Sequence, residues 1–241
     1  MLSEKPWRPD LALRLLAGFY AAMFLGQIVA LGYKEAVPNA ATNQLLVFAM
    51  GTFIYQGVTM VLVQIFLRQH NVSWSEAFGF GEPRLARTIF LGALVSILIL
   101  PVALSLAALS EKLIRMVGYT PDVQQPVRML MQSTSILQLA VQGVTAVIFA
   151  PIVEEIVFRG IIYPAFRHRM PPGIVLWGVS FLFAVSHMNL TALIALTVLG
   201  IILTFLYETT RNLLAPIIAH SLFNAVNFGY IVFQRYQEGA L

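Results

Sequence analysis

Residues 173–206 read GIVLWGVSFLFAVSHMNLTALIALTVLGIILTFL and contain no Asp, Glu, Lys or Arg. One α-helix of this length would extend about 50 Å, because each residue adds about 1.5 Å. That exceeds the hydrocarbon core of a bilayer, which is about 30 Å thick. The polar residues 186–191 interrupt the stretch. We therefore predict two membrane helices here, one ending at His187 and one covering residues 191–207.

The composition of the whole chain agrees with a membrane protein. Of its 241 residues, 59% are hydrophobic and 11% are charged, and the mean hydropathy is +0.80. Soluble domains are typically about 45–50% apolar and about 25% charged, so this chain cannot bury its apolar residues in one water-soluble core. The net charge of +4 is what basic loops on one side of a membrane supply, and it does not indicate nucleic-acid binding. The absence of Cys excludes a disulfide framework, a thiolate nucleophile and a Cys-ligated metal.

Five further apolar segments are long enough to cross a bilayer, which takes about 20 residues. They cover residues 11–31, 45–67, 88–110, 136–162 and 213–233. The first is too long for a signal-peptide core, so we expect it to be retained. The expected fold is all-α, a polytopic transmembrane bundle of about seven helices. Residues 1–134 are expected to form N-terminal helices and loops, and residues 135–241 a second bundle of four helices.

Two connecting segments are polar or amphipathic. Residues 68–87 place Trp74, Phe78 and Phe80 among charges, which is compatible with an interfacial segment or with an ordinary loop. Residues 111–134 are polar and contain two prolines, so we expect a loop with a surface helix.

The basic residues of the loops predict the orientation. If the N-terminus lies in the cytoplasm, more of the basic loop residues are on the cytoplasmic side than on the other side. This excess favours that orientation. The cytoplasmic group is Lys5, Arg8, Arg68, Arg84, Arg87, Arg167, Arg169 and Arg211, and the other is Lys34, Lys112, Arg115, Arg128 and Arg235.

Charged side chains inside the apolar segments occur in the sequence Pro151-Ile-Val-Glu154-Glu155-Ile-Val-Phe-Arg159. Such charges are costly at membrane depth and are usually functional. Glu155 and Arg159 are four residues apart, so a helix brings them together as an ion pair. Glu154 is rotated by about 100° and has no local partner, which suits a general base. A buried ion network that only fixes helix packing would also explain a single Glu–Arg pair. Pro151 removes one helical hydrogen bond just before the two glutamates.

Two other predicted helices carry polar residues with the same four-residue spacing. His187 follows Phe183 by four residues, and Asn224 follows His220 by four. Either pair alone is explained by hydrogen bonds between helices. Together with an unpaired Glu154 on a third helix, they indicate one site in the four C-terminal helices.

Three kinds of chemistry are compatible with this set. In amide hydrolysis, Glu154 and His187 would activate water, while His220 and Asn224 would donate hydrogen bonds to the oxyanion. Two His and one Glu also match a catalytic zinc site, although the His-Glu-x-x-His signature is absent. A chain of Glu and His could relay protons in a transporter, but the first three helices contribute a single charge, near a helix end. A serine nucleophile is not supported, because the serines beside the two histidines lack the Gly-x-Ser-x-Gly context.

The ordered motifs Glu154-Glu155-x-x-x-Arg159, Phe183-x-x-x-His187 and His220-x-x-x-Asn224 resemble the CPBP family. This group comprises the type II CAAX prenyl proteases and bacteriocin-processing enzymes, also called Abi proteins. The resemblance covers roughly residues 135–235 and implies an intramembrane glutamic endopeptidase. The residues it marks as catalytic are Glu154, Glu155, His187, His220 and Asn224, and those it marks as structural or orienting are Arg159 and Phe183.

The resemblance also implies roles, partners and location. Glu154 is the base that activates water with help from His187, and His220 and Asn224 stabilise the oxyanion. No metal or other cofactor is expected. The partners are a peptide or membrane-protein substrate and the lipid bilayer, without nucleic acid. The expected location is the bacterial cytoplasmic (inner) membrane, as a multi-pass protein. The alternative is a non-catalytic membrane scaffold or immunity protein of the same fold.

Overall fold

The computed structural model describes residues 5–37, 44–81, 84–121, 123–133 and 135–238. Every regular element within these ranges is a helix, which confirms the all-α prediction. In chain order the elements are α1 (Pro9–Ala36), α2 (Gln44–His70), α3 (Trp74–Phe78), α4 (Leu85–Met116), α5 (Gln125–Met131), α6 (Ile136–Val144), η2 (Thr145–Phe149), α7 (Ala150–Glu155), η3 (Ile156–Ile162), α8 (Tyr163–Arg167), α9 (Pro172–Val185), α10 (Leu193–Thr210) and α11 (Leu214–Gln237). The elements η2 and η3 are π-helical.

Each of the seven predicted membrane segments corresponds to a helix. Within the described residues, six helical segments are long and apolar enough to cross a membrane: α1, α2 from Leu45, α4, the continuous Ile136–Arg167 segment, α10 and α11. The seventh, α9, has 14 residues, so it is about 21 Å long and shorter than a bilayer core of about 30 Å. The break predicted at 186–191 is present, since α9 ends at Val185 and α10 begins at Leu193. The chain is thus an integral multi-pass membrane protein.

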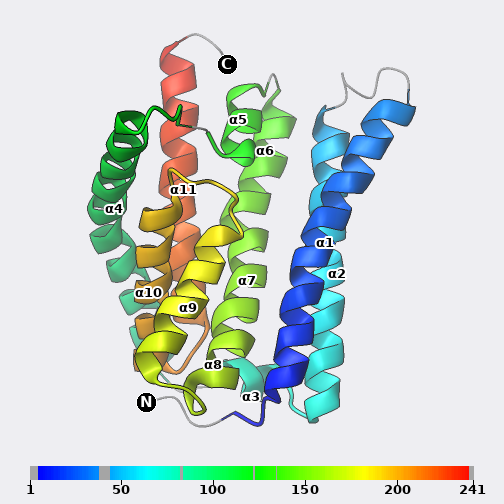
Figure 1. The fold of residues 1–241 in the computed structure, drawn as a ribbon, viewed down its shortest axis with the longest axis vertical. Coiled ribbons are helices and arrows are strands. Elements are labelled where there is room, and N and C mark those ends of the chain that lie inside the picture. Colours follow the sequence, from blue (N-terminus) through cyan, green and yellow to red (C-terminus); the bar gives the residue numbers. More distant parts are fainter. Residues whose placement is uncertain (1–4, 38–43, 82–83, 122, 134, 239–241) are drawn as a thin grey trace.

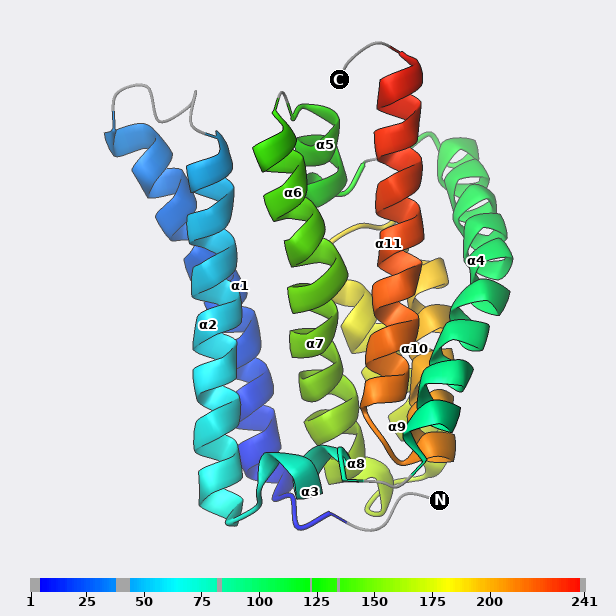
Figure 2. The ribbon, with the colours of Figure 1, turned by 180° about the vertical axis from the view of Figure 1, so that it is seen from behind.

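The segment Ile136–Arg167 is a single helical column in the middle of the molecule. It consists of α6, η2, α7, η3 and α8 in succession. In Figures 1 and 2 this column stands between the α1–α2 hairpin on one side and the group formed by α4, α9, α10 and α11 on the other. Residues of the column can therefore contact helices from both ends of the chain.

Small residues bring the helices on both sides close together. In the hairpin, a Cβ added at Gly26 would lie 2.4 Å from the carbonyl oxygen of Gly51, so only glycine fits. A Cβ added at Gly92 of α4 would lie 2.8 Å from the carbonyl oxygen of Ala215 in α11. Such close contacts are typical of membrane helices, which associate by packing rather than by the hydrophobic effect. The third predicted helix therefore packs against the C-terminal helices.

The segment 68–87 holds a short helix, α3, whose last two side chains are buried. Ser73 caps α3: its hydroxyl and its backbone N–H both donate to the Glu76 carboxylate, which lowers the pKa of that carboxyl. Phe78, the last residue of α3, has 0% exposure. The segment thus contributes to the core at the lower end of the column, where Figure 1 also shows α8 and the chain before α1.

The polar segment 111–134 contains the predicted surface helix as α5, preceded by the end of α4 at Met116. The two groups of basic residues assigned above to opposite sides of the membrane lie toward opposite ends of the helices. In Figure 1 the element ends that carry the larger group lie at the lower side, and α5 and the ends of α1, α4 and α11, which carry the smaller group, lie at the upper side. The two groups thus lie on opposite sides of the bundle, and the cytoplasmic position of the larger group stays a prediction.

Candidate active site

Both glutamates lie on α7, a six-residue α-helical segment between the π-helical segments η2 and η3. Each π-helical segment is followed, one residue later, by a proline: Pro151 or Pro164. Proline has no N–H to continue the α-helical ladder, and the residue before each proline donates to the carbonyl five positions back. These bonds are Ala150 N–H to Thr145 O and Tyr163 N–H to Phe158 O. Such π-bulges often occur at functional sites, where they re-aim side chains.

Glu155 and Arg159 form the predicted ion pair in the centre of the protein. Arg159 Nη1 donates to Glu155 Oε1 at 2.8 Å, and both side chains have 0% exposure. Arg159 Nη2 donates to the carbonyl oxygen of Gly200 at 3.0 Å, and its Cζ lies 4.3 Å from the ring centroid of Phe183. A buried charge persists only with such compensation, from an opposite charge, a hydrogen bond and an aromatic face. Phe183 thus lies against the guanidinium that pairs with Glu155.

His220 contacts the same carboxylate from α11. Its Nδ1 lies 2.9 Å from Glu155 Oε1, and the side chain is 2% exposed. Because Oε1 of the ion-paired carboxylate accepts, Nδ1 carries the hydrogen of this bond. The other ring nitrogen, Nε2, lies 4.0 Å from Glu154 Oε2. Glu155 therefore fixes the ring so that Nε2 faces the second glutamate.

His187 is fixed in the same way by a different acceptor. The predicted helix ended at His187, whereas α9 ends two residues earlier, at Val185, so His187 lies in the turn just beyond the helix. Its Nδ1 is 2.9 Å from the carbonyl oxygen of Phe183, which can only accept. Its Nε2 is 3.8 Å from Glu154 Oε2. Two imidazoles held by Nδ1 thus present Nε2 to one carboxylate oxygen.

Glu154 differs from its neighbour in its contacts. The part of the chain that the structure describes gives its carboxylate no hydrogen bond, and its side chain is 12% exposed. The separations of 3.8 and 4.0 Å from the two Nε2 atoms are too long for direct hydrogen bonds. Polar groups at such distances are commonly bridged by water. This arrangement can hold a water molecule between a potential base and two imidazoles.

Asn224 is placed differently from the other predicted residues. Its Nδ2 donates to the carbonyl oxygen of Ala146, in η2, at 2.9 Å. The structure thus brings together Glu154, Glu155, His187 and His220, and it ties Asn224 to the π-helical turn that precedes α7.

Several side chains near the site gave no signal in the sequence, because aromatic residues in apolar helices are usually lipid-facing or core residues. Tyr55 of α2 lies close enough to Glu154 for the two groups to interact electrostatically. Tyr20 of α1 donates its hydroxyl to the carbonyl oxygen of Leu182 in α9 at 2.9 Å. Trp7, which precedes α1, donates its indole N–H to the carbonyl oxygen of Gly160 at 3.0 Å. The α1–α2 hairpin and the chain before it therefore contact the Ile136–Arg167 column, which is the site helix because it carries both glutamates.

No group of three His, Cys, Asp or Glu side chains among the described residues is arranged to hold a metal ion. The nearest approach to such a set is Glu154 with the two Nε2 atoms, at the distances given above. The fold and the cluster together define a polytopic helical membrane protein with a Glu–His site inside its helix bundle.

Comparison with known proteins shows to which family and relative the chain is similar. Residues 136–226, which include every predicted site residue, match the family described as type II CAAX prenyl endopeptidase Rce1-like. Over 80 residues the chain is 35% identical to the protein named "Putative membrane peptidase YdiL" of Bacillus subtilis (strain 168), and this stretch covers 32% of each protein. The chain thus matches about a third of that relative's length. No solved structure matches the chain. Residues 136–226 are thus similar to the Rce1-like family, in agreement with the resemblance of the chain's motifs to CAAX proteases.

Proposed function

We propose that the protein is an intramembrane endopeptidase in which Glu154 and His187 activate water to hydrolyse a peptide bond. One observation carries the proposal: Glu154 Oε2 faces Nε2 of His187 at 3.8 Å and Nε2 of His220 at 4.0 Å. A water oxygen between these groups can bond to the carboxylate and to an imidazole. The similarity of residues 136–226 to a family described as endopeptidases supports the same reaction class.

The reaction needs a base, a stabilised oxyanion and a proton for the leaving amine. Glu154 takes one proton from the water while His187 Nε2 accepts a hydrogen bond from the remaining O–H, and the water oxygen bonds to the peptide carbonyl carbon. When the tetrahedral intermediate collapses, the C–N bond breaks and Glu154 passes its proton to the leaving nitrogen. The products are one carboxyl and one amino terminus, and Glu154 is regenerated.

The oxyanion is assigned to His220 and Asn224. Nδ1 of His220 is taken by Glu155, so the ring donates to the oxyanion from Nε2 in its doubly protonated form. With His220 in this form, the two positive charges of His220 and Arg159 balance the two negative charges of Glu154 and Glu155. The Asn224 amide has two hydrogens, of which one goes to the carbonyl oxygen of Ala146. The second hydrogen is the one assigned to the oxyanion.

The proposed substrate is a peptide or a membrane protein that reaches the site within the bilayer. The relative from Bacillus subtilis is named as a membrane peptidase, which supports a bacterial cytoplasmic membrane as the location. We assign catalysis to the bundle of residues 135–241, with residues 1–134 supplying the helices that pack around it.

The decisive experiment compares new protein N-termini in membranes containing the wild-type chain or the Glu154→Gln variant. Because the Glu154 carboxylate makes no hydrogen bond to a described residue, the variant should fold and insert normally but leave no cleavage products. Glu111→Gln, at an exposed position on α4, is the matched control and should cleave like the wild type. Unchanged cleavage by Glu154→Gln would sink the glutamate-base mechanism.

The same assay separates the glutamate mechanism from a zinc mechanism and from a non-catalytic function. Cleavage that survives EDTA and phenanthroline supports the glutamate mechanism, whereas loss of cleavage that zinc restores would assign a metal to Glu154, His187 and His220. A non-catalytic scaffold or immunity protein predicts that the Glu154→Gln chain keeps the biological phenotype of the wild type.

A further inference from the structure

The carbonyl of Gly160 lacks its α-helical donor. In an α-helix this oxygen would accept from the N–H of residue 164, but residue 164 is proline and has no N–H. Trp7 supplies the missing hydrogen from outside the helix, since its Nε1 lies 3.0 Å from Gly160 O. Trp7 has 0% exposure, so this bond is sealed from solvent and lipid. Buried carbonyls without a donor are strongly disfavoured.

The other π-helical segment has a matching contact. The carbonyl of Ala146 would accept from Ala150 in an α-helix, but the Ala150 N–H goes to Thr145 O. The residue one position later is Pro151, which has no N–H. Asn224 of α11 donates to Ala146 O at 2.9 Å. Each proline-linked π turn beside the two glutamates is thus completed by a side chain from a distant part of the chain.

Gly160 is also held by packing. A Cβ at this position would lie 2.6 Å from Cε1 of Phe78, the buried last residue of α3. Phe78 is fixed in turn, because its carbonyl accepts from the N–H of Leu213 at 2.9 Å. The Gly160 peptide therefore lies between the indole N–H of Trp7 and the ring of Phe78.

The chain before α1 is itself fastened at this end of the molecule. The backbone N–H of Arg8 donates to His70 Nε2 at 3.0 Å, and Trp7 packs edge-on against Phe66 and His70, both with ring centroids 5.2 Å away. Lys5 Nζ donates to the carbonyl oxygen of Glu76 at 2.7 Å. Trp7 is thus held by α2, the helix before α3, and is not a loose terminus.

A short series of contacts joins Trp7 to the site. Gly160 is bonded to Arg159, whose guanidinium pairs with Glu155, and Glu155 fixes the ring of His220. A shift or rotation of the η3 backbone at Gly160 would move Arg159 first and then the two groups it holds. None of these contacts requires Trp7 to touch a substrate.

We propose that Trp7 is a positioning residue for the active site: its indole N–H completes the π-helical turn at Gly160 and so sets the place of Arg159, Glu155 and His220. This inference rests on the proposed function for its effect on catalysis, although its effect on the η3 backbone does not. It assigns a role to a residue outside the stretch 136–226 that matches the endopeptidase family.

The test replaces Trp7 by Phe, which removes the N–H and keeps an aromatic ring. Trp74→Phe is the matched control, because Trp74 also loses one indole hydrogen bond, to Gln64 Oε1 at 2.8 Å, and this bond does not involve η3. Pro164→Ala is the rescue variant, since it restores a backbone N–H at the residue that should donate to Gly160. Pro164→Ala does not restore the ring volume that Trp7→Phe removes. Rescue by Pro164→Ala would therefore show that the lost hydrogen bond, and not the smaller ring, causes the effect of Trp7→Phe.

Two measurements are made on the full chain in detergent or nanodiscs. Hydrogen–deuterium exchange should become faster in residues 156–167 for Trp7→Phe, unchanged there for Trp74→Phe, and slow again in the Trp7→Phe/Pro164→Ala double variant. On a substrate found by the N-terminus comparison above, Trp7→Phe should lower kcat about tenfold, the loss expected for one buried hydrogen bond, with KM unchanged. The double variant should recover kcat.

Equal behaviour of the two Trp→Phe variants, or failure of Pro164→Ala to restore slow exchange, would overturn the proposal. A general loss of stability would raise exchange in all helices together and would also count against it. If the wild type shows no cleavage that depends on Glu154, the proposed function fails, whereas the exchange measurement still decides whether Trp7 holds the η3 backbone.

Discussion

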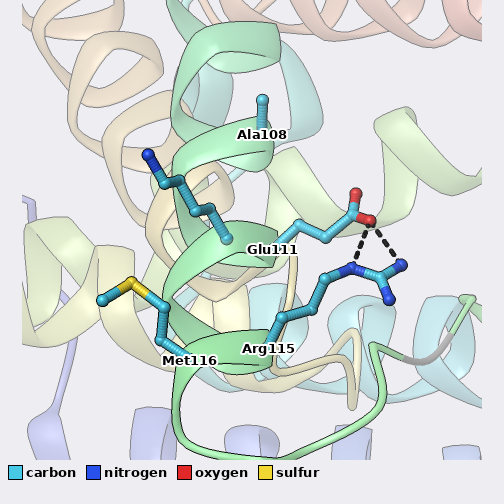
Figure 3. Close-up of a pocket in the computed structure, with 5 residues that line it drawn as sticks. Ala108, Glu111, Arg115 and Met116 are labelled. Carbon is cyan, nitrogen blue, oxygen red and sulfur yellow. Dashed lines mark hydrogen bonds and ion pairs between the residues drawn. The ribbon is translucent and has the colours of Figure 1, made fainter.

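Two Glu–Arg pairs in this molecule have the same four-residue spacing and nearly the same N···O distance, but one is buried and the other is exposed. Glu155 and Arg159 are 2.8 Å apart, and both have 0% exposed side chains. Glu111 and Arg115 are 2.7 Å apart, with side chains 46% and 61% exposed. Figure 3 shows the second pair on α4, beside a hollow whose lining residues all belong to that one helix.

The difference shows that burial, and not the four-residue Glu–Arg spacing, decides how much such a pair contributes to stability and to a site. An exposed pair gains little, because water and salt screen the attraction. A buried pair cannot lose one member without leaving the other charge uncompensated. The buried pair also has further contacts to His220 and Gly200, so it organises a site, whereas the exposed pair organises only its own helix.

The largest effect is expected from Arg159→Met, which leaves the Glu155 charge buried alone. The free energy of unfolding should fall by about 3–5 kcal/mol, as for other broken buried pairs. Thermal unfolding in detergent micelles measures it. The double variant Glu155→Gln/Arg159→Met should recover much of this loss, because no charge is then left unpaired. An Arg159→Met protein as stable as the wild type would break the comparison.

A smaller loss of unfolding free energy is expected from Gly160→Ala, which changes the packing of the buried site and leaves its charges unchanged. The new methyl group would meet the Phe78 ring at 2.6 Å, and overpacking of this kind costs about 1–3 kcal/mol. The matched control is Gly178→Ala on α9, where no atom lies within 4 Å of the added Cβ. Unfolding measurements should separate the two variants, and equal stabilities would show that the Gly160 contact relaxes freely.

The smallest effect is expected from Arg115→Met. The free energy of unfolding should change by less than about 1 kcal/mol, because exposed pairs contribute little. Raising the salt concentration should reduce even this difference. Measured beside Arg159→Met under the same conditions, it sharpens the comparison: a loss at Arg115 as large as that at Arg159 would mean that burial is not the deciding factor.

The helices could be predicted from the sequence because lipid imposes one strong rule: backbone polar groups must bond within their own segment. This rule located all seven apolar segments and the break between α9 and α10. The meeting of Glu154, Glu155, His187 and His220 also follows from membrane physics, since polar groups at such depth are stable only together. Their catalytic roles stay a prediction that the Glu154→Gln comparison tests.

The remaining features depend on contacts between residues far apart in the chain. Nothing in the local sequence pairs Trp7 with Gly160, 153 positions away, or Asn224 with Ala146, 78 positions away. The prolines at 151 and 164 signal a missing donor, but they do not say which side chain replaces it. Phe78 likewise looks interfacial among its charged neighbours, although it is buried against the site helix.

The shortness of α9 affects the path by which water can reach His187. At about 21 Å the helix does not cross a bilayer core of about 30 Å, and in Figures 1 and 2 its connection to α10 lies below the upper ends of α6 and α11. An irregular backbone at such depth is stable only where protein or water satisfies it. Protein does so in part, since Asn189 Oδ1 accepts from the N–H of Ala192 at 2.8 Å. His187 lies in this turn, so a water molecule has to pass less of the bilayer core to reach its imidazole than it would beside a helix that crosses the whole core.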